Sequence, residues 1–359
     1  MTKNILDNPA EMAKLDKNLL VANSLSSLSA QLLAGWQTAQ KIKLPANYSQ
    51  AGNIIFCGMG GSHLAPELIS EVFYNQIKKP LTLVRDYKLP AFADRNSLIV
   101  VCSYSGTTEE PLACLKEALK LKSKIIILAG GGELMKLADK NKLPNIIIDT
   151  SLNPSGQPRY GLGLQLGAVL NILSQIKVFK ISASEIAKSA ERLEKLSVNL
   201  LPNSKTANNN AKQLAKDLKD KNVLIIGAQH LNGNSRILAN QINESAKQLA
   251  VPFKLPELNH HLLDAFGHPQ NLFKNSAVIF LKSALYSPVL AKRLAVTQKV
   301  FQKLKLSCLI MDSSADNKLD SMLEILAFGS WVSFYLSMLN NENPSNIPWV
   351  NFFKKELHS

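Results

Sequence analysis

The chain has 359 residues, of which 46% are hydrophobic, and its formal net charge is +14. This length and composition exclude a disordered or fibrous protein and are sufficient for two domains of ordinary size. The positive charge favours anionic ligands. Nucleic acid is not expected among them, because aromatic residues make up only 6% of the chain and do not interleave with the lysines to form a stacking surface.

Two further features of the sequence indicate the cellular compartment and whether a membrane span or a metal site is expected. The long apolar stretch 319–339 contains Asp320 and Glu324, which favours a buried core or interface helix over a membrane span, and no secretory leader precedes the first helices. The four cysteines lack C-x-x-C spacing and mostly lie in apolar runs, as buried thiols of a reducing compartment do. The sequence therefore predicts a cytoplasmic protein with no membrane partner and no metal site.

The first half of the chain has the pattern of an α/β domain. Its first forty residues are predicted to be helical, because leucines and Trp36 recur there near helical spacing. Five apolar runs then alternate with amphipathic segments, which predicts βαβ units and a parallel sheet. The predicted strands are 53–57, 81–85, 98–102, 124–129 and 145–149.

The second half repeats this pattern. A predicted helix at 161–175 belongs to the first half, a polar linker follows at 201–210, and the run 222–227 then echoes the first strand of the chain. Further buried strands are predicted at 277–281 and 307–311. The expected fold is α/β, with two tandem domains at 1–200 and 211–359, each a parallel sheet flanked by helices.

Two turns of the first predicted sheet have the composition of phosphate-binding loops. A glycine-rich turn, 58–62, follows the first strand, and a hydroxyl-rich turn, 103–108, joins the third strand to a helix predicted at 111–121. The carboxyl ends of parallel strands meet at one edge, so both turns should open on one crevice. Backbone N–H groups at a helix N-terminus bind phosphate readily. The candidate phosphate-binding residues are Gly60, Gly61, Ser62, Ser103, Ser105, Thr107 and Thr108.

A dinucleotide fingerprint is the alternative interpretation of the glycine-rich turn. Gly58 and Gly60, with Asp86 downstream, imitate the G-x-G-x-x-G motif and its ribose-binding acid. His63 occupies the third glycine position, however, and a lone G-x-G is a weak signal. The sugar-phosphate interpretation is therefore favoured.

The two turns and several further motifs together resemble the bifunctional phosphoglucose/phosphomannose isomerases of the sugar isomerase (SIS) superfamily. The further motifs follow in the same order over nearly the whole chain: 82–90, Pro158-Arg159, 243–247, 256–260 and 353–357. The resemblance implies two SIS-type flavodoxin-like domains and a homodimer with a shared active site. It also implies aldose–ketose isomerisation of a hexose 6-phosphate without a cofactor.

The resemblance assigns roles to four residues. Glu244 is the base that moves a proton between C2 and C1 through an enediol, and His260 is the ring-opening group. Arg159 stabilises the enediolate, and Lys354 assists at the ring end of the sugar. The substrates implied are glucose 6-phosphate, and mannose 6-phosphate beside it, in exchange with fructose 6-phosphate.

Several alternatives stay open at the level of the sequence. Lys355 takes the role of Lys354 if the alignment slips by one position, and the sequence departs from the family pattern directly after His260, where His261 follows. A non-catalytic SIS module that senses a sugar phosphate, or another SIS sugar-phosphate isomerase, would carry the same phosphate loops.

Overall fold

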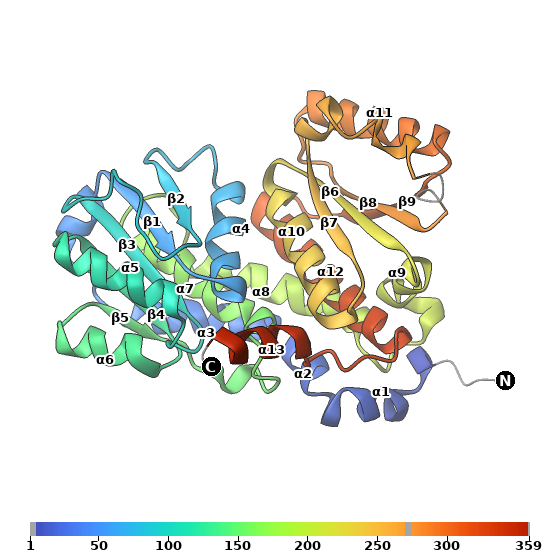
Figure 1. Ribbon diagram of the computed structural model, residues 1–359. Helices are drawn as coiled ribbons and strands as arrows, with labels where there is room; N and C mark the ends of the chain where they lie inside the picture. The colour runs from blue at the N-terminus through green and yellow to red at the C-terminus, as the bar shows by residue number, and fades with distance from the viewer. Residues whose placement is uncertain (1–4, 270–273, 358–359) are drawn as a thin grey trace. The chain divides into compact units, whose positions relative to one another are not determined.

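A computed structural model of the chain describes residues 5–269 and 274–357. The chain divides into two compact units, which we call the N-terminal unit, Ser27–Glu194, and the C-terminal unit, Met1–Ser26 with Lys195–Ser359. The predicted domain limits differ from this division at two places: residues 1–26 and residues 195–210 both group with the C-terminal unit. Each unit contains one parallel sheet (Figure 1).

The sheet of the N-terminal unit has five parallel strands in the order β2-β1-β3-β4-β5. All five predicted strands are present, two with the predicted limits and three with ends that differ by one or two residues: β1 (Asn53–Cys57), β2 (Leu81–Val84), β3 (Ser97–Ser103), β4 (Lys124–Ala129) and β5 (Asn145–Ile147). The central strand β3 is buried along its whole length. Its continuous apolar sequence is typical of a parallel strand that is covered on both faces.

Helices cover both faces of this sheet. Its helices are α3 (Leu28–Gln40), α4 (Leu64–Val72), α5 (Glu109–Lys120), α6 (Gly132–Lys140), α7 (Leu162–Gln175) and the start of α8 (Ala183–Ser197). On one face, Ile55, Ile99 and Ile127 form a core cluster with Cys114 of α5 and Leu134 of α6. The alternate strand residues are also buried, as expected for a sheet between two helical layers.

The contact between α3 and α7 determines where the loop 152–160 lies. Gly35 and Gly167 let the two helix backbones approach closely, because a Cβ at either position would overlap the backbone of the other helix. The buried side chain of Gln31 then donates hydrogen bonds to the carbonyls of Leu152 and Tyr160, each 3.0 Å away. One residue of α3 thus holds both ends of the loop that carries Arg159.

The sheet of the C-terminal unit has four parallel strands in the order β7-β6-β8-β9. Its strands are β6 (Asn222–Ala228), β7 (Ala250–Leu255), β8 (Ser276–Ser283) and β9 (Ser307–Ser313). Three of them confirm the predicted strands. The sequence did not predict β7, an edge strand that pairs only with β6 and contains Pro252, which suits an edge position.

The helices of the C-terminal unit are α1 (Pro9–Leu15), α2 (Leu20–Ser26), α9 (Asn210–Leu218), α10 (Asn232–Gln241), α11 (Pro288–Lys303), α12 (Lys318–Leu339) and α13 (Pro348–Leu357). Helix α12 is long and apolar enough to span a membrane by length and composition, but most of it is buried inside the unit. It is therefore a core helix, as predicted.

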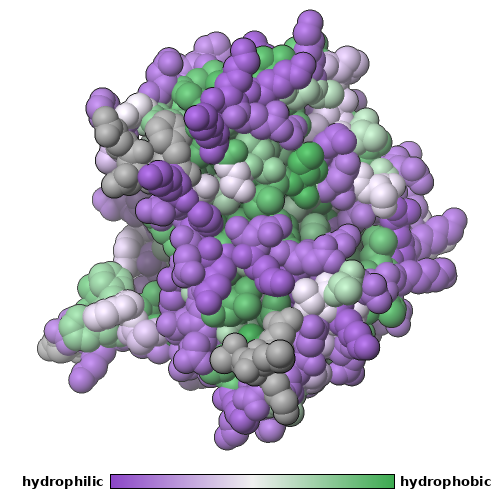
Figure 2. Space-filling view, turned by 90° about the vertical axis from the view of Figure 1, so that its right-hand side faces the viewer, coloured by the Kyte–Doolittle hydropathy of each residue, from purple (hydrophilic) through white to green (hydrophobic). Residues whose placement is uncertain are grey.

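The face of the molecule in Figure 2 is mainly hydrophilic, with apolar residues in separate patches.

The predicted linker 201–210 is anchored within the C-terminal unit. Lys212, at the start of α9, is fully buried, and its ammonium donates hydrogen bonds to the carbonyls of Pro202 and Ser204 at 2.8 and 2.6 Å. The same ammonium lies 5.2 Å from the ring centroid of Tyr335 in α12. Burial lowers the pKa of Lys212. The backbone of this segment is thus held by a buried lysine of the C-terminal unit.

Candidate functional site

The two predicted phosphate loops lie at the topological switch point of the N-terminal sheet. From β1 the chain passes outward to β2 and then returns to β3 on the other side of β1. Ligands of open parallel sheets bind at such a point, beyond the carboxyl ends of the strands. The glycine-rich turn follows β1 and the hydroxyl-rich turn follows β3. The structure thus brings together the two loops that the sequence analysis associated.

A hydrogen bond joins the two loops. The buried Ser62 hydroxyl accepts a hydrogen bond from the backbone N–H of Tyr104 at 2.8 Å. Ser62 therefore positions the second loop, in addition to any contact with a ligand. Removing this acceptor would leave a buried N–H without its partner.

The hydroxyl groups of the second loop fall into an inner and an outer pair. The inner pair is Ser103 and Thr108, whose hydroxyl oxygens are 3.0 Å apart, and the Ser103 oxygen also accepts the N–H of Gly106 at 3.0 Å. The outer pair is Ser105 and Thr107, which are exposed and joined by a 3.0 Å hydrogen bond. The outer hydroxyls are thus available to a ligand, while the inner ones shape the loop.

Helix α5 begins directly after this loop, and the positive end of its dipole favours an anion there. Thr108 is its N-cap residue, but the Thr108 side chain does not cap the backbone of the first turn. The positive end of the helix dipole and the first-turn N–H groups therefore remain directed at the loop. An anion held by Ser105 and Thr107 would lie next to them.

The glycine-rich turn brings a third loop to the site. Gly61 packs against Pro158 and Arg159 so closely that a Cβ would lie 2.8 Å from the Pro158 Cβ and 3.0 Å from the Arg159 backbone nitrogen. Gly60 adopts a positive φ of +50° and has open space around it. The first loop is therefore in direct contact with the backbone of the predicted charge-stabilising residue.

Arg159 is the cationic residue of this part of the site. It is only 4% exposed, its guanidinium donates to the Gln157 side chain at 3.1 Å, and it lies 4.9 Å from the centroid of the Tyr160 ring. A guanidinium cannot lose its charge in a protein, so a buried one favours a nearby anion. The structure thus links the two loops that carry the seven predicted phosphate-binding residues, and the first of them contacts the backbone of Arg159. The binding roles of these residues stay predictions.

Three residues that the sequence analysis did not select support this arrangement. Asn153 donates hydrogen bonds to the Tyr104 hydroxyl at 2.7 Å and to the Gln157 carbonyl at 2.9 Å. Burial raises the pKa of Tyr104, with the hydrogen bond from Asn153 opposing the rise in part. The tyrosine stays neutral and links the hydroxyl-rich loop to the loop of Arg159. The signal available in the sequence for Asn153 and Gln157 is the polar run 153–157, which directly precedes Pro158-Arg159.

Glu244 lies in the C-terminal unit, in a single π-helical turn, Ile242–Ala246, that extends α10. Such turns occur frequently at functional sites. The side chain of the preceding residue, Asn243, exchanges two hydrogen bonds with the backbone of Ala250 at 2.9 and 2.8 Å. This fixes the turn to the start of β7, and the half-buried Glu244 is thereby held in one backbone position.

His260 ends a short 3₁₀ turn, Glu257–His260, that follows β7. Leu258 is fully buried, and Asn259 donates a 2.7 Å hydrogen bond to the Thr297 hydroxyl of α11. These two residues anchor the turn, whereas His260 and the neighbouring His261 are both exposed. Exposure alone does not select between the two histidines, so the role of His260 stays a prediction.

Lys354 lies on α13, the helix that ends the described part of the chain. Both Lys354 and its alternative Lys355 are exposed. Glu244, His260 and Lys354 thus occupy three separate elements of the C-terminal unit, and their catalytic roles stay predictions.

The equivalent switch point of the C-terminal sheet is filled by its own side chains. The Gln229 side chain, after β6, accepts the backbone N–H of Ser287, after β8, at 3.0 Å, in the same topological position as the Ser62 contact. His230 is buried here against the Ser321 hydroxyl at 3.2 Å. Burial, assisted by the positive charge of Lys318, lowers the pKa of His230 to about 4. The phosphate-loop composition is thus confined to the N-terminal unit.

The sequence is similar to those of known sugar-phosphate isomerases. Residues 207–357 match the family described as the bacterial phospho-glucose isomerase C-terminal SIS domain. A bifunctional phosphoglucose/phosphomannose isomerase of Caldicellulosiruptor bescii is 25% identical over 338 residues, which are 93% of this chain and 98% of the relative. The chain is a relative of the bifunctional phosphoglucose/phosphomannose isomerases. The corresponding Aquifex aeolicus enzyme is 28% identical over 85% of this chain and 90% of its own length.

Solved structures share the fold of the whole chain. A hypothetical protein from Thermus thermophilus superposes with a TM-score of 0.69 over 98% of this chain and 90% of its own, at 14% identity. The C-terminal domain of a glucosamine-fructose-6-phosphate aminotransferase from Francisella tularensis gives a TM-score of 0.64 over 90% of this chain and 96% of its own, also at 14% identity. The predicted pair of parallel-sheet domains is therefore confirmed.

Proposed function

We propose that the protein is an aldose–ketose isomerase that interconverts fructose 6-phosphate with glucose 6-phosphate and with mannose 6-phosphate. The observation that carries this proposal is the assembly of the two phosphate loops and the buried Arg159 at one switch point. The relatives named as bifunctional phosphoglucose/phosphomannose isomerases, which align over most of the chain, support the same reaction.

The reaction needs four contributions, and residues of the appropriate chemistry are present for each. Ser105, Thr107 and the start of α5 hold the 6-phosphate, because they present hydroxyls, backbone N–H groups and the positive end of a helix dipole. Arg159 stabilises the negative charge that develops on the enediolate oxygen. An acid and a base complete the set.

Glu244 is the base in this proposal. It takes the proton from C2 of the open-chain aldose and returns it to C1, so that the aldehyde becomes a hydroxymethyl group and the C2 hydroxyl becomes a ketone. His260 opens the sugar ring by donating a proton to the ring oxygen as the bond from C1 to that oxygen breaks. The C1 hydroxyl loses its proton in the same step and becomes the aldehyde, and Lys354 assists at this end of the substrate. No redox step occurs outside the sugar, since two hydrogens move within one molecule.

The same proposal includes a homodimer with a shared active site, in the cytoplasm. Helix α13, which carries Lys354, exposes Trp349 to 80%, Phe352 to 57% and Phe353 to 61%. Aromatic side chains three and four residues apart share one helix face and bury well against a partner. Sedimentation should show a dimer, and Trp349→Ser with Phe352→Ser should shift it toward the monomer. A monomeric wild-type protein would contradict this part of the proposal.

Two other functions remain as alternatives. A D-glucosamine-6-phosphate 4-epimerase of Sulfolobus acidocaldarius is 27% identical over 61% of this chain and 66% of its own length, so related sequences carry another sugar-phosphate chemistry. A non-catalytic sensor would need the phosphate loops but not Glu244 or His260. The substrate profile separates these possibilities.

The test is a discontinuous assay of the purified protein on fructose 6-phosphate, in which glucose 6-phosphate and mannose 6-phosphate are measured separately. Formation of both aldoses is the expected result. Glucose 6-phosphate alone would restrict the activity to phosphoglucose isomerisation. Saturable binding of hexose phosphates without turnover would favour the sensor, and turnover only of an amino sugar phosphate would favour the other enzyme class.

A further inference from the structure

A second concave surface of the N-terminal unit lies away from the phosphate loops. It is a groove of about 870 Å³, formed by the segment before β2 and by the turn that joins α7 to α8. Lys79 stands just before β2, and its ammonium donates to the carbonyls of Ser49 and Ala51, which precede β1, at 2.6 and 2.7 Å. The groove is thus at the amino ends of the strands, whereas the phosphate loops follow their carboxyl ends.

The groove is held in shape by its own contacts. Helix α7 ends at Gln175, and Lys177 then adopts a left-handed conformation with φ of 61°, while the N–H of Val178 donates back to the Leu173 carbonyl at 2.9 Å. This is the hydrogen-bond pattern of a Schellman cap. The Phe179 ring stacks on Phe73 of the unit's core at a centroid distance of 3.9 Å. The walls are therefore preformed.

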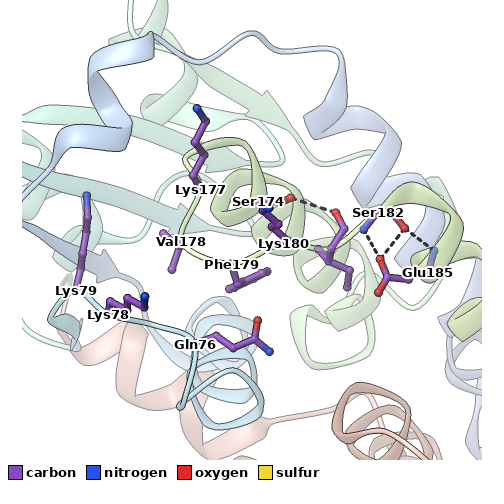
Figure 3. Close-up of a pocket in the computed structure, with 11 residues that line it drawn as sticks. Gln76, Lys78, Lys79, Ser174, Lys177, Val178, Phe179, Lys180, Ser182 and Glu185 are labelled. Carbon is purple, nitrogen blue, oxygen red and sulfur yellow. Dashed lines mark hydrogen bonds between the residues drawn. The ribbon is translucent and has the colours of Figure 1, made fainter.

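Positive charge gathers in this groove. Lys78, Lys177 and Lys180 are exposed, and among the described residues no acidic side chain forms an ion pair with any of them. Figure 3 shows Lys78, Lys79 and Lys177 toward one end of the groove, with Val178 and Phe179 between them and Ser182. Like charges that line one groove repel one another, so an anion that neutralises them is favoured.

The one carboxylate among the described residues that line the groove does not neutralise these lysines. Glu185 accepts hydrogen bonds from the Ser182 backbone N–H at 2.7 Å and from the Ser182 hydroxyl at 2.6 Å. The Ser182 hydroxyl and N–H lower the pKa of Glu185, which stays ionised and committed to the first turn of α8. The positive charge of the lysines is therefore not neutralised by Glu185.

We propose that this groove, which we call the lysine groove, binds a polyphosphate group of a small molecule, free or carried on a nucleoside. Several mobile ammonium groups recognise charge density rather than a planar shape, so a chain of phosphates satisfies them better than a single carboxylate. The volume is within the range of small-molecule sites, and the half-buried Val178 gives a carrier an apolar side chain to contact. The lysine groove is separate from the site of the proposed isomerisation.

The experiment is titration calorimetry of the full chain with inorganic tripolyphosphate and, separately, with ATP, in a buffer of low ionic strength without divalent cations. The groove variant is Lys78→Gln with Lys177→Gln and Lys180→Gln. The matched control is Lys116→Gln with Lys120→Gln and Lys140→Gln, which removes the same charge from exposed helix positions of the same unit. A second control, Ser105→Ala with Thr107→Val, alters the phosphate loops instead.

Saturable binding that weakens at least tenfold in the groove variant and less than twofold in both controls would support the proposal. ATP binding tighter than tripolyphosphate would identify a nucleoside carrier, whereas equal affinities would identify the phosphate chain alone as the ligand. Equal weakening in the groove variant and the lysine control would overturn the proposal, because the binding would then follow net charge. Loss only in the loop variant, or no saturable binding, would overturn it as well.

Discussion

Gly61 offers the sharpest test of the way the site is built. In the structure a Cβ at this position would lie 2.8 Å from the Pro158 Cβ and 2.9 Å from the Pro158 carbonyl carbon. Two carbon atoms prefer a separation of about 3.5 Å or more, so Pro158 would have to retreat by about 0.7 Å. The backbone nitrogen of Arg159 is 3.0 Å from the same Cβ and would move with it.

We therefore expect Gly61→Ala to lower the free energy of unfolding by about 1–3 kcal/mol, the usual cost of overpacking. Because it displaces Arg159 from the loops, it should also lower kcat/KM for fructose 6-phosphate by roughly 10- to 100-fold, as misplacements of about 1 Å do. Denaturant unfolding measures the first effect, and the aldose-forming assay measures the second. Inorganic phosphate should still protect the protein against heat, since the hydroxyl-rich loop is unchanged.

Gly52→Ala is the matched control. Gly52 belongs to the same unit, its added Cβ would have nothing within 4 Å, and its φ is not positive. This variant should differ from the wild type by less than about 0.5 kcal/mol in stability and less than twofold in kcat/KM. If Gly61→Ala behaves like Gly52→Ala in both measurements, the contact between the first loop and Arg159 does not position the site.

Two further predictions concern stability. Ser62→Ala should destabilise the protein by about 1–3 kcal/mol in denaturant unfolding, because the buried Tyr104 N–H loses its acceptor, whereas Ser105→Ala at the exposed tip should change stability by less than about 0.5 kcal/mol. His230 has a pKa of about 4 in the folded protein, whereas its ordinary value is 6.5. As the pH falls, the imidazole of the unfolded chain is therefore protonated before that of the folded protein, and the folded state loses stability between about pH 6.5 and pH 4. The full difference corresponds to about 3 kcal/mol. Unfolding measured across this window should be flatter in His230→Asn than in the wild type, while the exposed His261→Asn should keep the wild-type slope; equal slopes in all three would contradict the assignment.

The architecture was largely predictable because the strands are continuous apolar runs. β4 has the predicted limits, and β3 differs by one residue at each end, because both are central and buried. β7 was missed for the opposite reason. It is an edge strand with exposed Val251 and Lys254 and a proline, so it lacks the apolar run that marks a buried strand.

The site was predictable as a set of loops but not as a set of contacts. The compositions of the turns after β1 and β3, and the rule that such turns share a crevice, were sufficient to associate Ser62 with Ser103. The contact of Gly61 with Arg159 joins residues about a hundred positions apart, and the hold of Gln31 on the same loop depends on how α3 packs on α7. Local patterns carry no information on such distant pairings.

The π-helical turn at Glu244 illustrates another limit. The run Ile242–Ala246 has the composition of an ordinary polar helix, and nothing in its sequence marks a π-helical turn. The wider turn arises because the Asn243 side chain binds the backbone of Ala250 and Lys247 takes a left-handed conformation with φ of 51°. The composition of the run shows neither feature, and both lie beside the residue assigned as the base.

The central claim is that Glu244 moves the proton. Its most direct test compares Glu244→Gln with Glu257→Gln, an exposed carboxylate of the same unit, in turnover of fructose 6-phosphate and in calorimetric binding of the same sugar phosphate. We predict that Glu244→Gln loses about 10²- to 10⁴-fold in kcat while its dissociation constant stays within a few fold of the wild type, and that Glu257→Gln is unchanged in both. Turnover by Glu244→Gln at the wild-type rate would contradict the account.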